Sequence, residues 1–335
     1  MLILTNGLTE KADEGFLNVA NNLVKRIKKS CPNTTVVSYE RSSHLTDRYI
    51  KLNKLLLNKE LISLIRLCDE DLLYIPFPAK AIATALRIFI LSIFVKRKLK
   101  VLLVMKTGFN YFTSLLVLLS RAEIIVLSRE SEMFYKKYLP DRKIKYIKTG
   151  VDTTRFVPVS VEKLASLKVK YGLSSDKPVL LHVGHLKHGR NLDILKNVDQ
   201  KYQVLIVISS MTEKERDTDL CQILENCENV RIIDEYLSNI EELYQLADAY
   251  IFPTVEEGNC IDTPLSCLEA AACNKPVITT SYGEMKEFAN VKGLFFIKDA
   301  DINAVIEMAL NCDECLTRES VLSYDWNYAV ENLSD

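Results

Sequence analysis

A loop with two glycines and several basic residues follows a short apolar run in residues 179–195, VLLHVGHLKHGRNLDIL. Gly184 opens a turn after the predicted strand, and Lys187 and Arg190 lie on either side of Gly189 just before a predicted helix. The free N–H groups and dipole of a helix start suit a phosphate group, and Arg can bind one through two hydrogen bonds. The pattern predicts a phosphate site; the alternative is a surface loop with incidental bases.

Two groups of residues resemble metal ligands, but neither is expected to bind a metal. His182, His185 and His188 recur every three residues, yet His182 falls within the strand and the other two fall in the turn, so a shared ligand face is not expected. Cys312 and Cys315 form a C-x-x-C pair that no second pair accompanies. We predict no metal at either place.

A second stretch, EEGNCIDTPLSCLEAAACNKPVITT at residues 256–280, places one carboxylate inside a short apolar helix. Thr263 is the predicted N-cap and Pro264 the first helical residue, and Glu269 lies about one and a half turns further on. A carboxylate there can accept hydrogen bonds from a diol such as a ribose. The alternative is an ordinary exposed glutamate.

The elements that carry these stretches alternate between strands and helices, which predicts an α/β protein with parallel sheets covered by helices on both faces. In such folds ligands bind at the carboxyl ends of strands. The pattern falls into two blocks with a break near residues 149–160, so we expect two doubly wound domains. The predicted strands lie in residues 1–7, 34–40, 71–77, 100–106, 122–128 and 143–150, and in residues 178–184, 202–210, 229–235, 249–254, 276–280 and 293–298.

Composition supports two domains with different partners. The chain has 335 residues, 48% of them hydrophobic, which is enough for two ordinary cores. The first 150 residues hold 26 Lys and Arg against 13 Asp and Glu, whereas the remainder holds 17 against 31. Because no nucleic-acid motif is found, the basic half points to anionic lipid or a phosphorylated substrate rather than to nucleic acid.

The expected location is the cytoplasm. No signal peptide is evident, and nine irregularly spaced cysteines are typical of reduced thiols. The longest apolar run, residues 81–95, is interrupted by Arg87 and is shorter than the roughly 20 residues that a membrane-spanning helix needs. We expect a buried or interfacial helix there.

In order and spacing, these stretches resemble the nucleotide-binding domain of family 4 retaining glycosyltransferases of the GT-B fold. The resemblance rests on IKTGVDTTRFVP, LHVGHLKHGRNLDIL, VRIIDEYLSNIEELYQLADAYIFPT and residues 256–280. It implies two Rossmann-like domains facing a central cleft, with an acceptor domain in residues 1–155 and a nucleotide-sugar domain in residues 160–320. YDWNYAVENL resembles the family's final helix, so residues 321–335 are expected to cross back to the first domain.

The resemblance also implies roles for individual residues. The family's phosphate-binding pair corresponds to His185 and Arg190, with Lys187 as a helper, and the ribose-binding glutamate corresponds to Glu269. The base is expected near residues 233–237. The implied catalytic residues are Glu257, Arg190 and Lys187, and the implied donor-binding residues are Gly184, His185, Gly189, Arg190, Tyr236, Gly258, Asn259, Asp262, Thr263, Pro264, Leu265, Glu269 and, from the loop after the first strand, Gly15.

The glutamate that contacts the donor sugar is displaced relative to the family pattern. Counting back eight positions from Glu269 reaches Ile261, whereas alignment from the preceding strand reaches Glu257, which implies four extra residues in the loop. Glu256, Glu257 and Asp262 all remain open, and Glu257 is preferred.

The first half resembles the family less closely. The family often carries a histidine after a strand in the middle of this domain, but VLLVMKTGFNY has none. Lys106, Thr107 or Asn110 are the alternatives at the expected cleft. Basic clusters at residues 25–30 and 96–100 have apolar neighbours, which suggests peripheral contact with an anionic membrane.

The predicted function is transfer of a sugar, with retention, from a nucleoside diphosphate sugar to a glycan or lipid-linked acceptor. The resemblance implies no cofactor and no metal, because Arg190 and helix N–H groups would offset the charge of the leaving diphosphate. Two alternatives remain: a non-catalytic sugar-nucleotide-binding or scaffold protein of the same fold, and a GT-B nucleotide-sugar epimerase. The epimerase needs acid–base groups from both domains, and the only histidine in the first half is His44.

Overall fold

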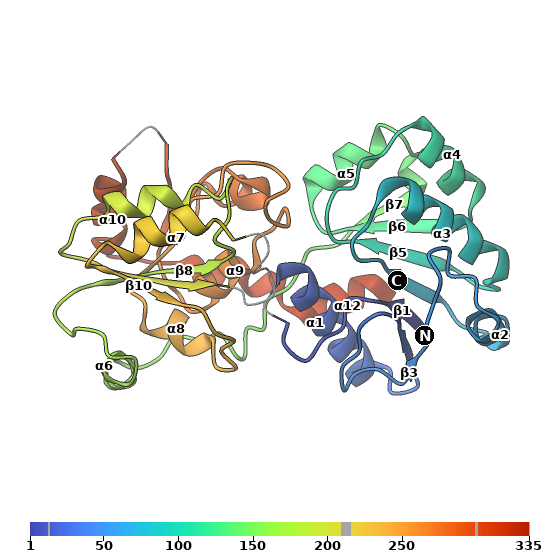
Figure 1. Cartoon of the computed structure of the whole chain (residues 1–335), viewed down its shortest axis with the longest axis horizontal. Coiled ribbons are helices and arrows are strands. Elements are labelled where there is room, and N and C mark those ends of the chain that lie inside the picture. Colours follow the sequence, from blue (N-terminus) through green and yellow to red (C-terminus); the bar gives the residue numbers. More distant parts are fainter. Residues whose placement is uncertain (13, 209–215, 299–300, 335) are drawn as a thin grey trace. The chain divides into compact units, whose positions relative to one another are not determined.

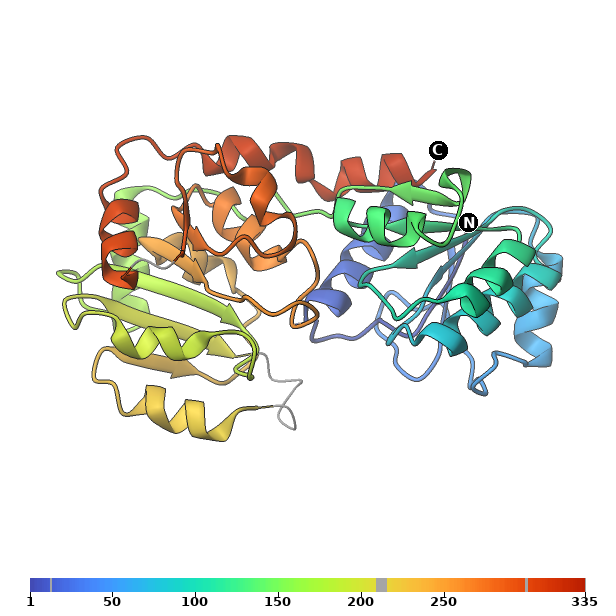
Figure 2. The same ribbon diagram turned by 90° about the horizontal axis from the view of Figure 1, so that it is seen from above.

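The computed structural model describes residues 1–12, 14–208, 216–298 and 301–334, which form two compact units. Unit 1 comprises Met1–Thr149 together with Trp326–Asp335, and unit 2 comprises Gly150–Asp325. Each unit is built on a parallel sheet with helices on both faces (Figures 1 and 2).

Unit 1 contains a seven-stranded parallel sheet in its described residues, with strand order β3-β2-β1-β4-β5-β6-β7. The reversal of strand order beside β1 is the arrangement of doubly wound folds. The strands are β1 (Leu2–Thr5), β2 (Thr35–Ser38), β3 (Arg48–Tyr49), β4 (Leu72–Ile75), β5 (Leu99–Leu103), β6 (Ala122–Val126) and β7 (Ile144–Tyr146). The helices are α1 (Gly15–Ser30), α2 (Lys59–Leu67), α3 (Ala81–Phe94), α4 (Tyr111–Leu119), α5 (Arg129–Lys136), the 3-10 turn η1 (Asp141–Lys143) and α12 (Trp326–Ser334).

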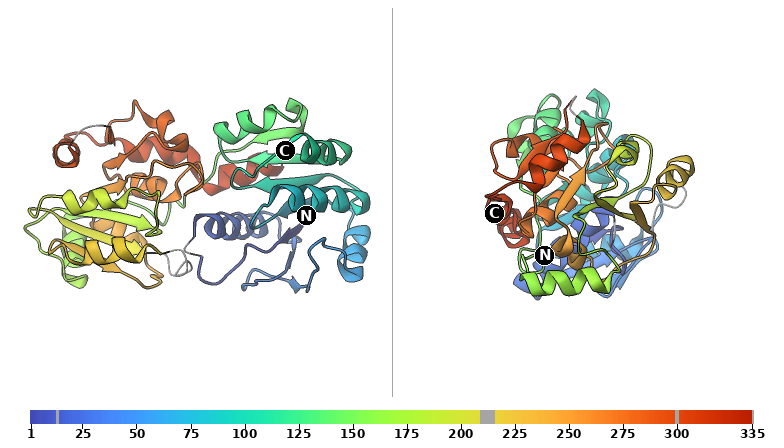
Figure 3. Two further views of the ribbon diagram at one scale, coloured as in Figure 1. Left: turned by 45° about the horizontal axis from the view of Figure 1, so that its top comes forward. Right: turned by 90° about the vertical axis from the view of Figure 1, so that its left-hand side faces the viewer.

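Alternate residues of these strands face opposite layers, because side chains of a strand point to opposite faces of the sheet. Leu2 and Leu4 of β1 join one core cluster with residues of α2, α3, α4 and α5. On the other side of the sheet α12 packs beside α1 (Figures 1 and 3). The buried Lys100 of β5 donates a 2.8 Å hydrogen bond to the main-chain oxygen of Leu333, which fixes the end of α12.

Unit 2 contains a six-stranded parallel sheet in its described residues, with strand order β10-β9-β8-β11-β12-β13. The strands are β8 (Val179–Gly184), β9 (Gln203–Ile208), β10 (Val230–Ile233), β11 (Ala249–Phe252), β12 (Val277–Thr279) and β13 (Leu294–Phe296). The helices are α6 (Val161–Lys170), η2 (Leu192–Asn197), α7 (Thr218–Glu225), α8 (Glu241–Leu246), α9 (Leu265–Ala272), η4 (Gly283–Phe288), α10 (Ile302–Leu310), α11 (Thr317–Val321) and η5 (Leu322–Tyr324).

The sheet of unit 2 separates two apolar cores. Leu181 of β8 packs with residues of α6, α8, α9 and α11, whereas the adjacent Leu180 packs with residues of η2, α7 and α10. Each fully buried Leu or Ile contributes roughly 1.5–3 kcal/mol. The two layers of helices can be followed in Figures 1 and 3.

The predicted α/β fold with two doubly wound sheets is confirmed. Each predicted strand has a counterpart, although Ser209 and Ser210 of the predicted run 202–210 lie outside the described residues. The sequence missed β3, which has only two residues and is exposed. The helix expected after the β8 loop is the short 3-10 helix η2. Within the described residues, no helix combines the length and apolar character that a membrane span requires.

Candidate functional site

The β8 loop, residues 184–191, leaves the carboxyl end of β8, the central strand that pairs with both β9 and β11. Gly184 ends the strand where a side chain has no room, since an added Cβ would lie 2.7 Å from Nη1 of Arg190 and 3.3 Å from Nε2 of His182. The absence of a side chain at Gly184 therefore allows the guanidinium of Arg190 to pack directly on the strand end.

Arg190 joins the β8 loop to a second loop. Its side chain is only 4% exposed, and it donates to the main-chain oxygen of Asn259 from Nε at 3.1 Å and from Nη2 at 2.8 Å. No ion pair with a carboxylate satisfies this guanidinium among the described residues. A buried cation without a carboxylate partner leaves positive charge for an anionic ligand.

The acid loop, residues 256–262, packs against the β8 loop at a second point. Gly189 has φ +84°, and a Cβ there would collide with the side chains of Glu256 and Asn259. Asn259 Nδ2 donates to Glu256 Oε2 at 3.2 Å. Beside this contact is a cavity of about 430 Å³, lined by Lys187, His188, Gly189, Asn191, Leu192, Asp193, Asp217, Asp219, Leu220, Ile223, Val255 and Glu256.

Two histidines of this region, His182 and His185, are held neutral by burial. Burial, helped by the Arg190 charge, lowers the pKa of His182 to about 4, and its Nδ1 lies 2.8 Å from the Ile251 oxygen, so Nδ1 carries the proton. Burial, with the charges of Arg190 and Lys187, lowers the pKa of His185 to about 3. In the part of the chain that the structure describes, no three His, Cys, Asp or Glu side chains are placed to hold a metal ion.

Residues that follow β12 hold the main chain of the acid loop, and the sequence analysis did not single them out. The Cys260 N–H donates to the Tyr282 hydroxyl at 3.0 Å, and this hydroxyl donates to the Cys260 oxygen at 2.6 Å. The Glu284 N–H donates to the Asp262 oxygen at 2.8 Å. Nothing local in the sequence marks Tyr282 or Glu284 as residues that hold this loop.

Gly283, in that turn, has φ +51°, and a Cβ there would collide with the Asp262 backbone. Ile261, which stands where eight-residue spacing from Glu269 leads, is 5% exposed and packs into the core. Since residue 261 is a buried isoleucine, the acids of this loop are Glu256, Glu257 and Asp262.

Helix α9 presents Glu269 at its accessible side. Of its eight residues only Ser266 and Glu269 are not fully buried, and their three-residue spacing puts them on one face. Glu269 also lies close to buried Tyr244, whose pKa is raised by burial first and by this carboxylate second. A charged residue is tolerated in this apolar helix because it lies on the accessible face.

The predicted start of α9 is wrong by one residue. Pro264, not Thr263, is the N-cap, because its ψ of 114° is extended and its oxygen accepts from the Cys267 N–H at 3.1 Å. Thr263 and Leu265 on either side are buried. Proline offers no side-chain acceptor, so the N-cap residue makes no side-chain hydrogen bond to the start of α9.

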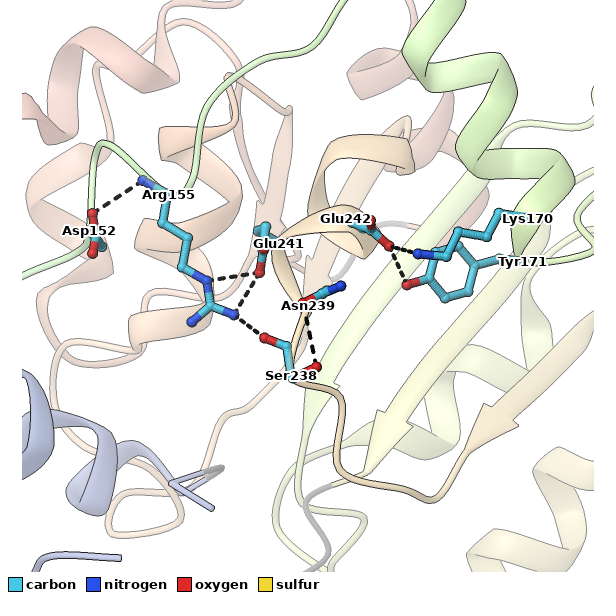
Figure 4. Close-up of polar contacts among 8 residues, drawn as sticks. All are labelled: Asp152, Arg155, Lys170, Tyr171, Ser238, Asn239, Glu241 and Glu242. Atoms are coloured by element: carbon cyan, nitrogen blue, oxygen red, sulfur yellow. Dashed lines mark hydrogen bonds and ion pairs between the residues drawn. The ribbon is translucent and has the colours of Figure 1, made fainter. Parts of the chain in front are cut away.

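The loop after β10, which carries the exposed Tyr236, is held by Arg155 of the segment before α6 (Figure 4). Arg155 Nη2 donates to the Ser238 oxygen at 2.6 Å, and Nε and Nη2 both donate to Glu241 Oε2, at 2.8 and 2.6 Å. The next residue, Glu242, accepts from Lys170 Nζ and the Tyr171 hydroxyl, at 2.5 and 2.7 Å (Figure 4).

Direct contacts between the β8 loop and the acid loop bring together four of the predicted residues, namely Gly184, Gly189, Arg190 and Asn259. Gly258, at φ +82°, and Glu257 are exposed at the tip of the acid loop. Gly15 is the first residue of α1 in unit 1, and so lies outside this group.

The three residues proposed in place of the missing histidine have structural partners in unit 1. Asn110 caps α4 through the Thr113 N–H, and Lys106 pairs with Glu130 at 3.3 Å. Thr107 is buried, and its N–H donates to the Tyr135 hydroxyl at 3.1 Å.

Comparison with known proteins agrees with this geometry. Residues 177–312, which contain both loops and α9, match the family model described as glycosyl transferases group 1. This part of the chain is a group 1 glycosyl transferase domain. The chain is also 24% identical over 147 residues to the α-galactosylglucosyldiacylglycerol synthase of Streptococcus pneumoniae. This match covers 42% of this chain and 38% of that protein.

Solved structures show that the whole chain, including the group 1 domain, has the GT-B fold. A glycosyltransferase from Rickettsia africae matches with a TM-score of 0.79 at 15% identity, covering 99% of this chain and 96% of its own. Anabaena HepE in complex with UDP matches with a TM-score of 0.79 at 15% identity, covering 99% and 98%.

Proposed function

We propose that the protein is a retaining glycosyltransferase that moves a sugar from a nucleoside diphosphate sugar to an acceptor. The observation that carries the proposal is the junction of the β8 loop and the acid loop, where Arg190 bonds Asn259 and Gly189 packs on Glu256. A buried cation, the start of α9 and a loop with several acids thus follow the carboxyl ends of the paired strands β8 and β11. The match of the group 1 family model over these residues supports the reading.

The charges of the side chains suggest which part of the donor each residue binds. Arg190 and Lys187 bind the diphosphate, together with N–H groups at the start of α9, and Glu269 accepts hydrogen bonds from the ribose. When the bond between the anomeric carbon and the phosphate oxygen breaks, the diphosphate leaves with its negative charge. Fixed cations and dipoles stabilise that developing charge, which is usually the most valuable contribution in such a site. We therefore propose transfer without a metal ion or cofactor.

Glu257 is the proposed sugar-contacting acid. Glu256 turns toward Gly189 and Asn259 instead, and the main chain of Asp262 is bonded to Glu284. Tyr236, at the carboxyl end of β10, is the proposed neighbour of the base. The proposed donor is a UDP-sugar, because HepE, which shares the fold, has been solved with UDP and with UDP-glucose.

The proposed acceptor is lipid-linked, and the proposed location is the cytoplasmic face of an anionic membrane. The name of the Streptococcus relative, a diacylglycerol glycolipid synthase, supports the acceptor. Unit 1 supports the location, because the exposed residues of α4 are all apolar: Tyr111, Phe112, Leu115, Leu118 and Leu119. Exposed Arg97 and Lys98 follow α3, which packs on α4, and the neighbouring Lys96 pairs with Asp69 at 2.7 Å.

The basic clusters of the sequence are only partly available for such contact. Lys28 pairs with Asp47 at 2.6 Å, and Lys100 is buried against Leu333. The membrane proposal therefore depends mainly on the apolar residues of α4, and its basic residues are Arg97 and Lys98 after α3 and the exposed Lys25 and Lys29.

The deciding experiment measures donor binding and donor turnover together. Thermal-shift screening against UDP-, GDP- and ADP-sugars should show stabilisation by a UDP-sugar, roughly 2.7 kcal/mol at 100 times its dissociation constant. NMR should then show slow release of UDP from that donor, abolished in Glu257→Ala. Binding with no turnover against any acceptor would indicate a scaffold protein, and a changed sugar without UDP release would indicate an epimerase.

A further inference from the structure

One tyrosine hydroxyl satisfies both main-chain polar groups of a single residue in the acid loop. The Tyr282 hydroxyl accepts from the Cys260 N–H at 3.0 Å and donates to the Cys260 oxygen at 2.6 Å. The Tyr282 side chain is 6% exposed, and its ring meets the Phe252 ring edge-on at 5.9 Å. The ring is thus anchored on β11 while its hydroxyl holds the loop.

Two other contacts fix the residues on either side of Cys260. Arg190 holds the oxygen of Asn259, and the Glu284 N–H holds the oxygen of Asp262. These three contacts hold the main chain of residues 259–262 in one conformation. Glu257 and Gly258 directly precede the anchored half and are exposed.

Removal of the Tyr282 hydroxyl affects the loop more than removal of an ordinary tyrosine hydroxyl would. It leaves the N–H and oxygen of Cys260 without their partner, at a residue whose neighbours Asn259 and Ile261 are half-buried and buried. Unsatisfied buried main-chain groups are costly, so the loop would move toward water to satisfy them. Such a movement displaces the acids of the loop.

We propose that Tyr282 is a positioning residue that holds the acid loop in its active conformation before the donor binds. The proposal rests on the proposed function, because the acid so positioned is the one that contacts the sugar. A catalytic group contributes fully only when it is held in place before the reaction, and a shift of about 1 Å can be costly. Tyr282 therefore acts through the acid loop and does not touch the nucleotide.

The test is Tyr282→Phe, which removes the hydroxyl and keeps the ring. The matched control is Tyr171→Phe, which removes a hydroxyl that bonds Glu242 on α8, away from both loops. Hydrogen exchange in residues 256–262 should rise roughly tenfold in Tyr282→Phe and stay unchanged in Tyr171→Phe. With UDP-glucose as donor, kcat should fall roughly tenfold, whereas the Kd for UDP should change less than about twofold.

Two results would overturn the proposal: unchanged exchange in the acid loop, or faster exchange with unchanged kcat, since a purely structural tyrosine would lower Tm alone. Absence of UDP-glucose turnover in the unmodified protein would count against the proposed function and not against Tyr282. In that event the ratio of UDP-glucose to UDP affinity decides: a lower ratio in Tyr282→Phe supports the positioning role, and an unchanged ratio overturns it.

Discussion

The guanidinium of Arg190 donates two hydrogen bonds to the main-chain oxygen of Asn259, so one cationic side chain joins the β8 loop to the acid loop. Both loops follow strands of the same sheet, β8 and β11, which pair directly. The residue that supplies positive charge therefore also sets the distance between the two loops. Changes at Arg190 are expected to affect charge and geometry together.

Arg190→Ala should lower kcat/KM for the UDP-sugar by about 100-fold, which is typical of losing one group that stabilises developing negative charge. Arg190→Lys should recover only part of this, because Lys keeps the charge but not the paired donors. Steady-state donor turnover measures both. Lys177→Ala, which removes an exposed charge before β8, is the control and should match the unmodified protein. Equal activity in Arg190→Ala would exclude a role at the phosphate.

Gly184→Ala should weaken UDP binding at least tenfold, because its Cβ would stand 2.7 Å from Arg190 Nη1 and displace the guanidinium. Gly108→Ala is the matched control, since a Cβ there meets no atom within 4 Å. Isothermal titration with UDP distinguishes the two variants. If Gly184→Ala and Gly108→Ala both bind UDP like the unmodified protein, the packing of Arg190 on the end of β8 is not required for UDP binding.

Glu269→Gln should raise the Kd for UDP roughly tenfold, since hydrogen bonds to a charged group contribute about 1.5–3 kcal/mol and the amide retains part of that. The exposed Glu307→Gln on α10 serves as control. Isothermal titration with UDP and with the ribose-free ligand pyrophosphate locates the effect. A ribose role requires that pyrophosphate binding stay the same; equal losses for both ligands would contradict it.

Stability should fall on acidification because His182 is buried and neutral. Its pKa is lowered to about 4 in the folded protein, against about 6.5 when unfolded, so the unfolded chain binds more protons between these values. Its contribution is complete above about pH 6.5 and is lost as pH falls toward 4, with a slope of at most about 1.4 kcal/mol per pH unit. Urea unfolding at several pH values should show a shallower slope in His182→Asn, which keeps a donor for Ile251.

Phe112→Ser with Leu115→Ser on α4 should reduce co-sedimentation with vesicles containing phosphatidylserine at low salt, because binding scales with buried apolar area. UDP-induced thermal stabilisation should be unaffected. The matched control is Val161→Ser with Val169→Ser, which removes two exposed apolar residues from α6 of unit 2. A loss of vesicle binding only in the control pair would place the membrane contact elsewhere.

Most strands could be predicted because a buried strand shows its burial in a short run of neighbouring residues. The run VLLHVG is apolar except for His182, and its residues are buried or half-buried, which is typical of a parallel strand covered on both faces. The strand β3 has no such signal, because Arg48 and Tyr49 are exposed at the sheet edge and pair only with β2. Its existence depends on pairing with β2 and not on an apolar pattern of its own.

The site was predictable only in part, for the same reason. Arg190 and Glu269 carry charge in unusual local contexts, so residue type and spacing single them out. Tyr282 has no local signal, because its importance comes from the fold of the acid loop onto the end of β12. Thr263 was preferred to Pro264 as N-cap because its side chain can accept a hydrogen bond, yet the backbone angles decided for Pro264.

The chain passes between the units twice, and both passages leave unit 2 at one place. The Val151 N–H donates to the Tyr324 oxygen at 2.8 Å, and the Thr153 hydroxyl donates to Asp325 Oδ2 at 2.6 Å. Unit 2 is therefore an insertion with paired ends, placed between β7 and α12 of unit 1. Excision of residues 150–325 would remove a continuous segment, whereas unit 1 can be made whole only by joining residue 149 to residue 326.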